Sequence, residues 1–180
     1  MKNILKTLTA IVVAAVTLIY NANAQSAIGG SSASDAPSFS TSAIDDATGE
    51  PRDKDTLIGI HPHAVKDFEK SFKGITNEKW SRLNHGYIAS FTVDSVQTSI
   101  AYSRKGVSLY TIRSYGGKKL PYKIRDIVKS VYYDYTIVSV TEVYFDDEPV
   151  YIVYIQDETH LKTIGVYEGE MQEVRNYKRG

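Results

Sequence analysis

The chain contains no cysteine among its 180 residues. Disulfides therefore cannot stabilise the fold, a cysteine nucleophile is excluded, and lipid attachment to an N-terminal cysteine has no acceptor. A folded domain in this chain must depend on the packing of its side chains.

Sequence motifs of catalysis are also missing. The chain has no G-x-S-x-G elbow, no H-E-x-x-H pair and no glycine-rich phosphate loop. These absences predict that the protein is not an enzyme and needs no cofactor.

An excess of positive charge is absent as well, because 21 Lys and Arg residues balance 21 Asp and Glu residues. Removing the leader described below takes away Lys2 and Lys6 and no acid, which leaves 19 basic against 21 acidic residues. A nucleic-acid partner normally requires a basic face, so we predict none.

The first residues have the pattern of a secretory signal peptide. Lys2 and Lys6 precede the apolar run "LTAIVVAAVTLIY", and small residues in "ANAQS" surround a cleavage site after Ala24. An uncleaved membrane anchor is the alternative, but the run is shorter than the roughly 20 apolar residues that span a bilayer. We therefore predict a signal peptide over 1–24, a periplasmic or secreted location, and no membrane association after cleavage.

Residues 25–56 are rich in Ser, Ala, Asp, Gly and Pro and contain few large apolar residues. Such a segment buries too little surface to offset the entropy lost on ordering. The composition predicts a disordered linker over 25–56, followed by one domain over 57–180.

Two segments of that domain are nearly the same. "HPHAVKDFEKSF" begins at His61, and "LPYKIRDIVKSV" begins at Leu120. Each has a proline at its second position and apolar residues at i, i+3 and i+7, the spacing of one helix face. The pattern predicts two amphipathic helices with the same start.

After each helix the apolar period changes to two, as in "YIASFTV" and "YIVYI". Turn residues at His85-Gly86, Asp94-Ser95, Lys105-Gly106, Asp157-Glu158 and Glu168-Gly169 divide each half into about four strands. We predict an α+β fold of two tandem helix-plus-four-strand repeats, over about 60–116 and 119–180. Both helices are expected on one face of an antiparallel sheet.

Several of these segments resemble one known family. "VKDFEKSFKGITNEKW", "GYIASF", "IAYSRKG", "LPYKIRDIVKSVY" and "IGVYEGEMQEV" together resemble the PepSY-like domains related to the beta-lactamase inhibitor protein. The resemblance covers roughly residues 60 to 180. It implies two tandem α/β repeats and a non-enzymatic, protein- or peptide-binding role outside the cytoplasm.

Metal binding has two weak candidates in the sequence. His61 and His63 could bind a metal with His85 or His160, but they fit equally a polar helix entrance and turns. The acidic run Asp146-Asp147-Glu148 has ligands suited to calcium, yet is more typical of a solvated hairpin tip. We predict no metal site.

Tyrosine is abundant, with 14 residues in the chain. Tyrosine favours strands for structural reasons, and it is also enriched in protein interfaces. If Tyr87, Phe91 and Tyr151 face the helices, alternation sends Ile88, Ser90 and Tyr154 to the opposite, open face. The predicted partner-binding residues are Ile88, Ser90, Tyr110, Tyr154 and Tyr167, whereas Trp80 is predicted to belong to the core.

Two functions remain compatible with these observations. The first is a secreted or periplasmic module that binds or inhibits an envelope or extracellular protein through the open sheet face. The second is a structural or folding-assistance domain for another envelope protein.

Overall fold

The computed structural model describes residues 57–145 and 148–179. The signal peptide predicted over 1–24, the linker predicted over 25–56, and Asp146 and Asp147 of the acidic run lie outside the described residues.

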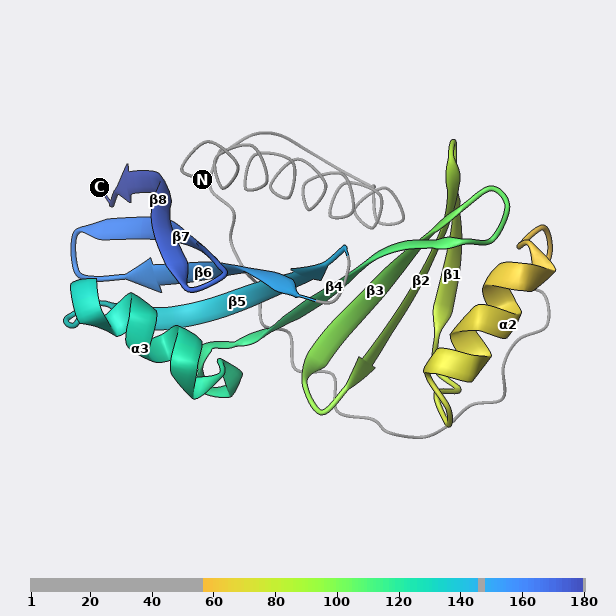
Figure 1. Cartoon of the computed structure of the whole chain (residues 1–180), viewed down its shortest axis with the longest axis horizontal. Helices are drawn as coiled ribbons and strands as arrows, with labels where there is room; N and C mark the ends of the chain where they lie inside the picture. The colour runs from red at the N-terminus through yellow and green to blue at the C-terminus, as the bar shows by residue number, and fades with distance from the viewer. Residues whose placement is uncertain (1–56, 146–147, 180) are drawn as a thin grey trace, which may run out of the picture.

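The described chain is an α+β domain with one open antiparallel sheet of eight strands in sequential order (Figure 1). This arrangement confirms the predicted α+β class and the antiparallel sheet. The first half consists of α2 (Pro62–Ser71), β1 (Lys79–Leu83), β2 (Gly86–Val93), β3 (Val96–Ser103) and β4 (Ser108–Gly116). A short 3-10 helix, η2 (Gly117–Lys119), leads to α3 (Tyr122–Val131), β5 (Thr136–Tyr144), β6 (Pro149–Gln156), β7 (His160–Tyr167) and β8 (Glu170–Lys178).

The tight turns of the sheet occur where the turn residues predicted them. Asp94 and Ser95 connect β2 to β3 with φ values of 49° and 58°, and Glu168 and Gly169 connect β7 to β8 with 50° and 81°. Two consecutive positive φ values match the right-handed twist of the strands they join. These two-residue turns fix the register of their hairpins.

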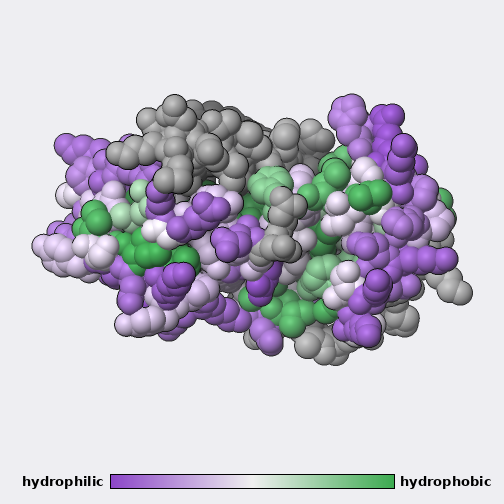
Figure 2. All heavy atoms as spheres, in the orientation of Figure 1, coloured by the Kyte–Doolittle hydropathy of each residue, from purple (hydrophilic) through white to green (hydrophobic). Residues whose placement is uncertain are grey.

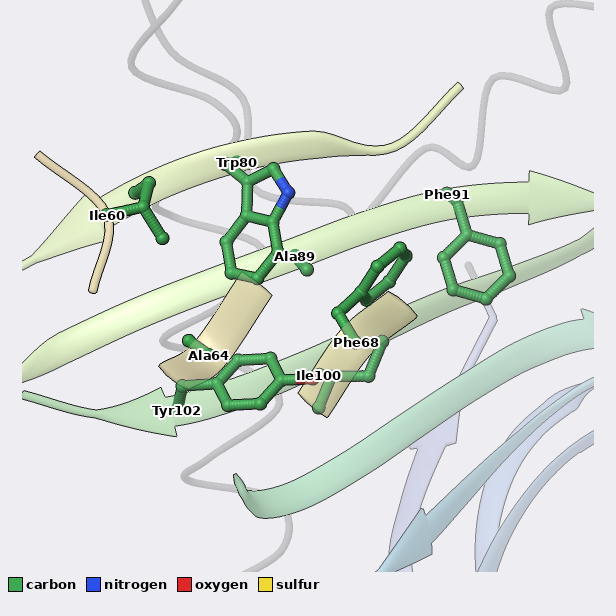
Figure 3. Close-up of a cluster of buried hydrophobic side chains, with 8 residues drawn as sticks. All are labelled: Ile60, Ala64, Phe68, Trp80, Ala89, Phe91, Ile100 and Tyr102. Atoms are coloured by element: carbon green, nitrogen blue, oxygen red, sulfur yellow. The ribbon is translucent and has the colours of Figure 1, made fainter. Parts of the chain in front are cut away.

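Helix α2 begins as its sequence predicts. Pro62 occupies the first turn, and His61 caps the helix by accepting a hydrogen bond from the backbone N–H of His63 at 3.2 Å. Ala64 and Phe68 are fully buried, and Figure 3 shows Phe68 between Trp80 and Phe91. The Phe68 ring meets these two rings edge-on at centroid distances of 5.6 and 5.7 Å.

Trp80 is buried in this cluster, which confirms its prediction as a core residue. The residues that share the cluster come from α2, its preceding turn and the first three strands. They are Ile60, Ala64, Phe68, Ala89, Phe91, Ile100 and Tyr102. The first half therefore has a core of its own beneath α2.

Helix α3 packs differently from α2 in detail. Val128 is fully buried, and Ile124 and Ile127 pack at the margin of the second core cluster. Val131, expected on the apolar stripe, is 57% exposed, whereas the next residue, Tyr132, packs against the second core cluster. The end of the helix therefore contacts the core through Tyr132 and not through Val131.

Both helices lie on the same face of the sheet. Strand pairing aligns one row of side chains across six strands: Phe91, Thr98, Arg113, Glu142, Tyr151 and Val166. Phe91 belongs to the core under α2, whereas Tyr151 and Val166 belong to the core under α3. The other face of the sheet, called the helix-free face below, carries neither α2 nor α3.

In the turn between β6 and β7, the Asp157 carboxylate accepts several hydrogen bonds. Partial burial disfavours the charged form of Asp157. Hydrogen bonds outweigh that effect, because Oδ1 accepts the backbone N–H groups of Thr159 and His160, each at 2.6 Å. The pKa of the Asp157 carboxyl is thus held well below its usual range.

We expect Asp157→Asn to be less stable than the wild type at neutral pH and to approach it in acid. A carboxyl whose pKa is lowered by folding contributes stability above its unfolded pKa, and that stability is lost as the pH falls through the folded pKa. Urea unfolding at about pH 7 and about pH 3 measures the difference. A difference that is the same at both pH values would contradict this account.

Candidate binding face

The five predicted contact residues all lie on the helix-free face. Ser90 pairs with Ser99, and this row continues through Ile112, Val143 and Val150, opposite to the row that contacts the helices. Ile88 and Tyr110 are aligned through Ala101 between them. Tyr154 and Tyr167 alternate with the helix-facing residues Val153 and Val166. The predicted side-chain alternation is therefore confirmed.

An aliphatic cluster forms the centre of this face. Its buried members are Ile88, Ile112, Val143, Val150 and Ile152. The partly buried rings of Tyr110, Tyr154 and Tyr167 pack against it. The structure thus brings four of the five predicted residues into one cluster, although they are far apart in the sequence.

The sequence predicts an exposed Ile88 on the open face, but the side chain is buried. Only 5% of its surface is accessible, because it packs within the aliphatic cluster. Alternation correctly predicts the side to which Ile88 points, but it does not show how neighbouring strands fill the space above it. Ile88 is therefore a core residue that supports the face.

Small hydroxyl residues lie beside the aliphatic cluster. The Oγ atoms of Ser90 and Ser99 are 2.8 Å apart across β2 and β3, and Ser114 Oγ lies 3.5 Å from Thr141 Oγ1 across β4 and β5. Ser90 is half-buried and already has this partner. The face therefore combines aliphatic, phenolic and hydroxyl groups.

Sequence reasoning missed Phe145 at the end of β5. Its side chain is 39% exposed, and its ring centroid lies 5.7 Å from that of Tyr110. Burial raises the pKa of the Tyr110 phenol, so this hydroxyl stays protonated as a donor. Phe145 follows Val143 by two residues, so strand alternation could have placed both on one face.

Two of the histidines considered as metal ligands, His61 and His63, have contacts within the domain. His61 accepts the N–H of His63, and His63 Nδ1 lies 2.9 Å from the carbonyl oxygen of Gly106. Within residues 57–145 and 148–179, no three His, Cys, Asp or Glu side chains are grouped as a metal would need. In the same ranges, no helix has the length and apolarity required to cross a bilayer.

Known structures share the architecture described above. A BLIP-like protein from Bacteroides fragilis aligns with a TM-score of 0.52 and 17% identity, over 70% of this chain and 92% of its own. A DUF2874 family protein from Bacteroides ovatus aligns with a TM-score of 0.53 and 14% identity, over 66% of this chain and 87% of its own. The likeness at these identities shows a BLIP-like fold.

A third structure, from Bacteroides eggerthii, is provisionally described as periplasmic. It aligns with a TM-score of 0.52 and 14% identity, over 66% of this chain and 88% of its own. No protein-family model matches the chain, and no curated protein matches it.

Proposed function

We propose that the protein is an exported, non-enzymatic module that binds another protein through its helix-free face. The observation that supports this most strongly is the set of Tyr110, Tyr154 and Tyr167 around a buried aliphatic cluster. Tyrosine gives a large contact area with little loss of side-chain entropy, and it is common in interface hot spots. Ser90 contributes a hydroxyl beside these rings.

The sequence and the fold neighbours support the finer parts of this proposal. The two similar segments that form α2 and α3 favour two copies of one helix-plus-four-strand unit, as in PepSY-like domains. The leader, together with one neighbour provisionally described as periplasmic, favours a location in the periplasm or outside the cell. A partner would then be an envelope or extracellular protein.

Tyr154→Ala is expected to weaken partner binding by about 30-fold or more, which corresponds to an interface hot spot of about 2 kcal/mol. Tyr133→Ala is the matched control, because Tyr133 is 79% exposed and follows α3. The wild type and both variants are immobilised, and proteins of the producing cell's periplasm are captured on each. The recovered partner is then titrated against all three.

The expected result is one stoichiometric partner that binds the wild type and Tyr133→Ala alike and binds Tyr154→Ala poorly. Melting temperatures measured in parallel show whether Tyr154→Ala remains folded. Equal affinity for all three proteins would contradict the proposed face. Capture of many unfolded proteins would favour the folding-assistance function.

A further inference from the structure

A cleft opens on the opposite side of the sheet, between α2 and α3. It encloses about 720 Å³. Phe72 and Ile75, which follow α2, form one wall, and Lys119 and Pro121, which precede α3, form the other. Figure 2 shows hydrophobic residues gathered in the lower middle of the view, where Figure 1 draws the β2–β3 hairpin. Val93, Asp94 and Val96 of this hairpin line the cleft. We call it the inter-helix cleft.

The floor of the inter-helix cleft contains a buried carboxylate. The Glu142 side chain is 4% exposed, and its Oε2 accepts a hydrogen bond from Arg113 Nη1 at 3.1 Å. Its Oε1 accepts the Tyr115 hydroxyl at 2.7 Å. Burial and this hydrogen bond raise the pKa of the Tyr115 phenol far above its usual value, so Tyr115 remains a donor. Each oxygen of Glu142 therefore accepts a hydrogen bond from a side chain of the same sheet.

Arg113, unlike Glu142, has most of its hydrogen-bonding groups available, because few of its N–H donors are used. A guanidinium has five N–H donors, and Arg113 uses Nη1 for Glu142. Its side chain is 42% exposed and lines the cleft. Across the mouth, Lys119 donates from Nζ to the backbone carbonyl of Asp94. Arg113 and Lys119 thus line the cleft together with two acidic residues, Asp94 and the already paired Glu142.

Aromatic and aliphatic side chains surround these cations. The rings of Phe72 and Phe91 lie 5.2 Å apart, and Ile75, Val93, Val96 and Pro121 add to the apolar lining. A ligand pocket of this size commonly combines apolar walls with a few polar groups that fix orientation. The combination favours a ligand with an apolar body and a negatively charged end.

We propose that the inter-helix cleft binds an amphipathic carboxylate. The apolar part packs against Phe72 and Phe91, and the carboxylate accepts hydrogen bonds from the free donors of Arg113 and from Lys119. Arginine suits this role because its planar donors match a carboxylate in a bidentate geometry. This site lies on the opposite face of the sheet from the proposed partner surface and does not depend on it.

The probe for this site is 3-phenylpropionate, and 3-phenylpropanamide is its uncharged control of the same shape. Each is titrated into the isotope-labelled exported protein, and amide chemical shifts are followed by NMR. We expect saturable shifts at Phe91, Arg113 and Lys119, with the acid binding about tenfold more tightly than the amide. Equal binding of acid and amide, or no saturable shift from either, would overturn the proposal.

Variants separate binding from folding. Arg113→Gln is expected to weaken binding of the acid by about tenfold. Because it also removes a partner of Glu142, Lys119→Gln serves as a second variant that leaves the Glu142 contacts intact, and it should weaken binding several-fold. Lys118→Gln is the matched control, since Lys118 is exposed and does not line the cleft. Unchanged affinity in Lys119→Gln and in folded Arg113→Gln would likewise refute the site.

Discussion

Alanine in place of Phe68 is expected to lower the free energy of unfolding by about 3 to 5 kcal/mol, the usual range for a buried phenylalanine. Phe68 is fully buried, and its ring contacts Phe72, Trp80 and Phe91. Its removal leaves a cavity between α2 and the sheet that these rings cannot fill without leaving their own contacts. Urea unfolding followed by far-ultraviolet circular dichroism measures the change.

The same experiment tests whether the two halves unfold together. Strands β4 and β5 pair along Thr111 to Gly116, so one continuous sheet joins the cores under α2 and α3. We expect a single transition that Phe68→Ala shifts as a whole. Tyr133→Ala, at an exposed position, should shift it by less than about 1 kcal/mol. Two transitions, with only one moved by Phe68→Ala, would show independent halves.

The second large effect is expected on the helix-free face. Ile152→Ala should cost about 2 to 5 kcal/mol, because Ile152 is 1% exposed at the centre of the aliphatic cluster. Val138→Ala is its control, since Val138 lies on β5 and is 40% exposed. Equilibrium unfolding of both variants measures the difference.

The comparison of the two variants tests whether a packed aliphatic cluster supports the helix-free face. A loss of a few kcal/mol for Ile152→Ala, with a small loss for Val138→Ala, means that a packed cluster supports the surrounding tyrosines. A loss below about 1 kcal/mol for Ile152→Ala would contradict the cluster and would mean that its side chains are open to water.

Much of the fold was predictable because short stretches of the sequence indicate where helices start, where turns occur and which face each strand residue takes. The prolines at Pro62 and Pro121 mark both helix starts, and turn residues such as Asp94 and Ser95 mark the hairpins. Alternation in β2 correctly assigned Tyr87 and Phe91 to the helix side and Ser90 to the other face. Each of these features depends on residues that are close together in the chain.

Burial was less predictable because it depends on strands that meet only in the folded sheet. Ile88 was expected to be exposed, but it packs in the same cluster as Val143 and Val150, which lie more than fifty residues further along the chain. Side chains on the helix-free face can be buried, because aliphatic residues of neighbouring strands pack together beneath aromatic rings. The tyrosines at the margin are the part of the face that the sequence placed correctly.

No short stretch of the sequence indicates the inter-helix cleft. Arg113 and Glu142 are 29 residues apart, and they meet because the register of β4 and β5 places them side by side. The gap above them exists because α2 ends at Ser71 and α3 starts at Tyr122, on opposite sides of the cleft. Only the assembled sheet with both helices shows this arrangement.

Photo-crosslinking in the producing cell tests whether a protein partner binds the helix-free face. A benzophenone amino acid is placed at Tyr154 on that face and, in a separate protein, at Tyr133 beside α3. We expect one discrete crosslinked protein from position 154 and none from position 133. A crosslink of the same protein from position 133, with none from position 154, would place the binding surface on the helix side and contradict the account.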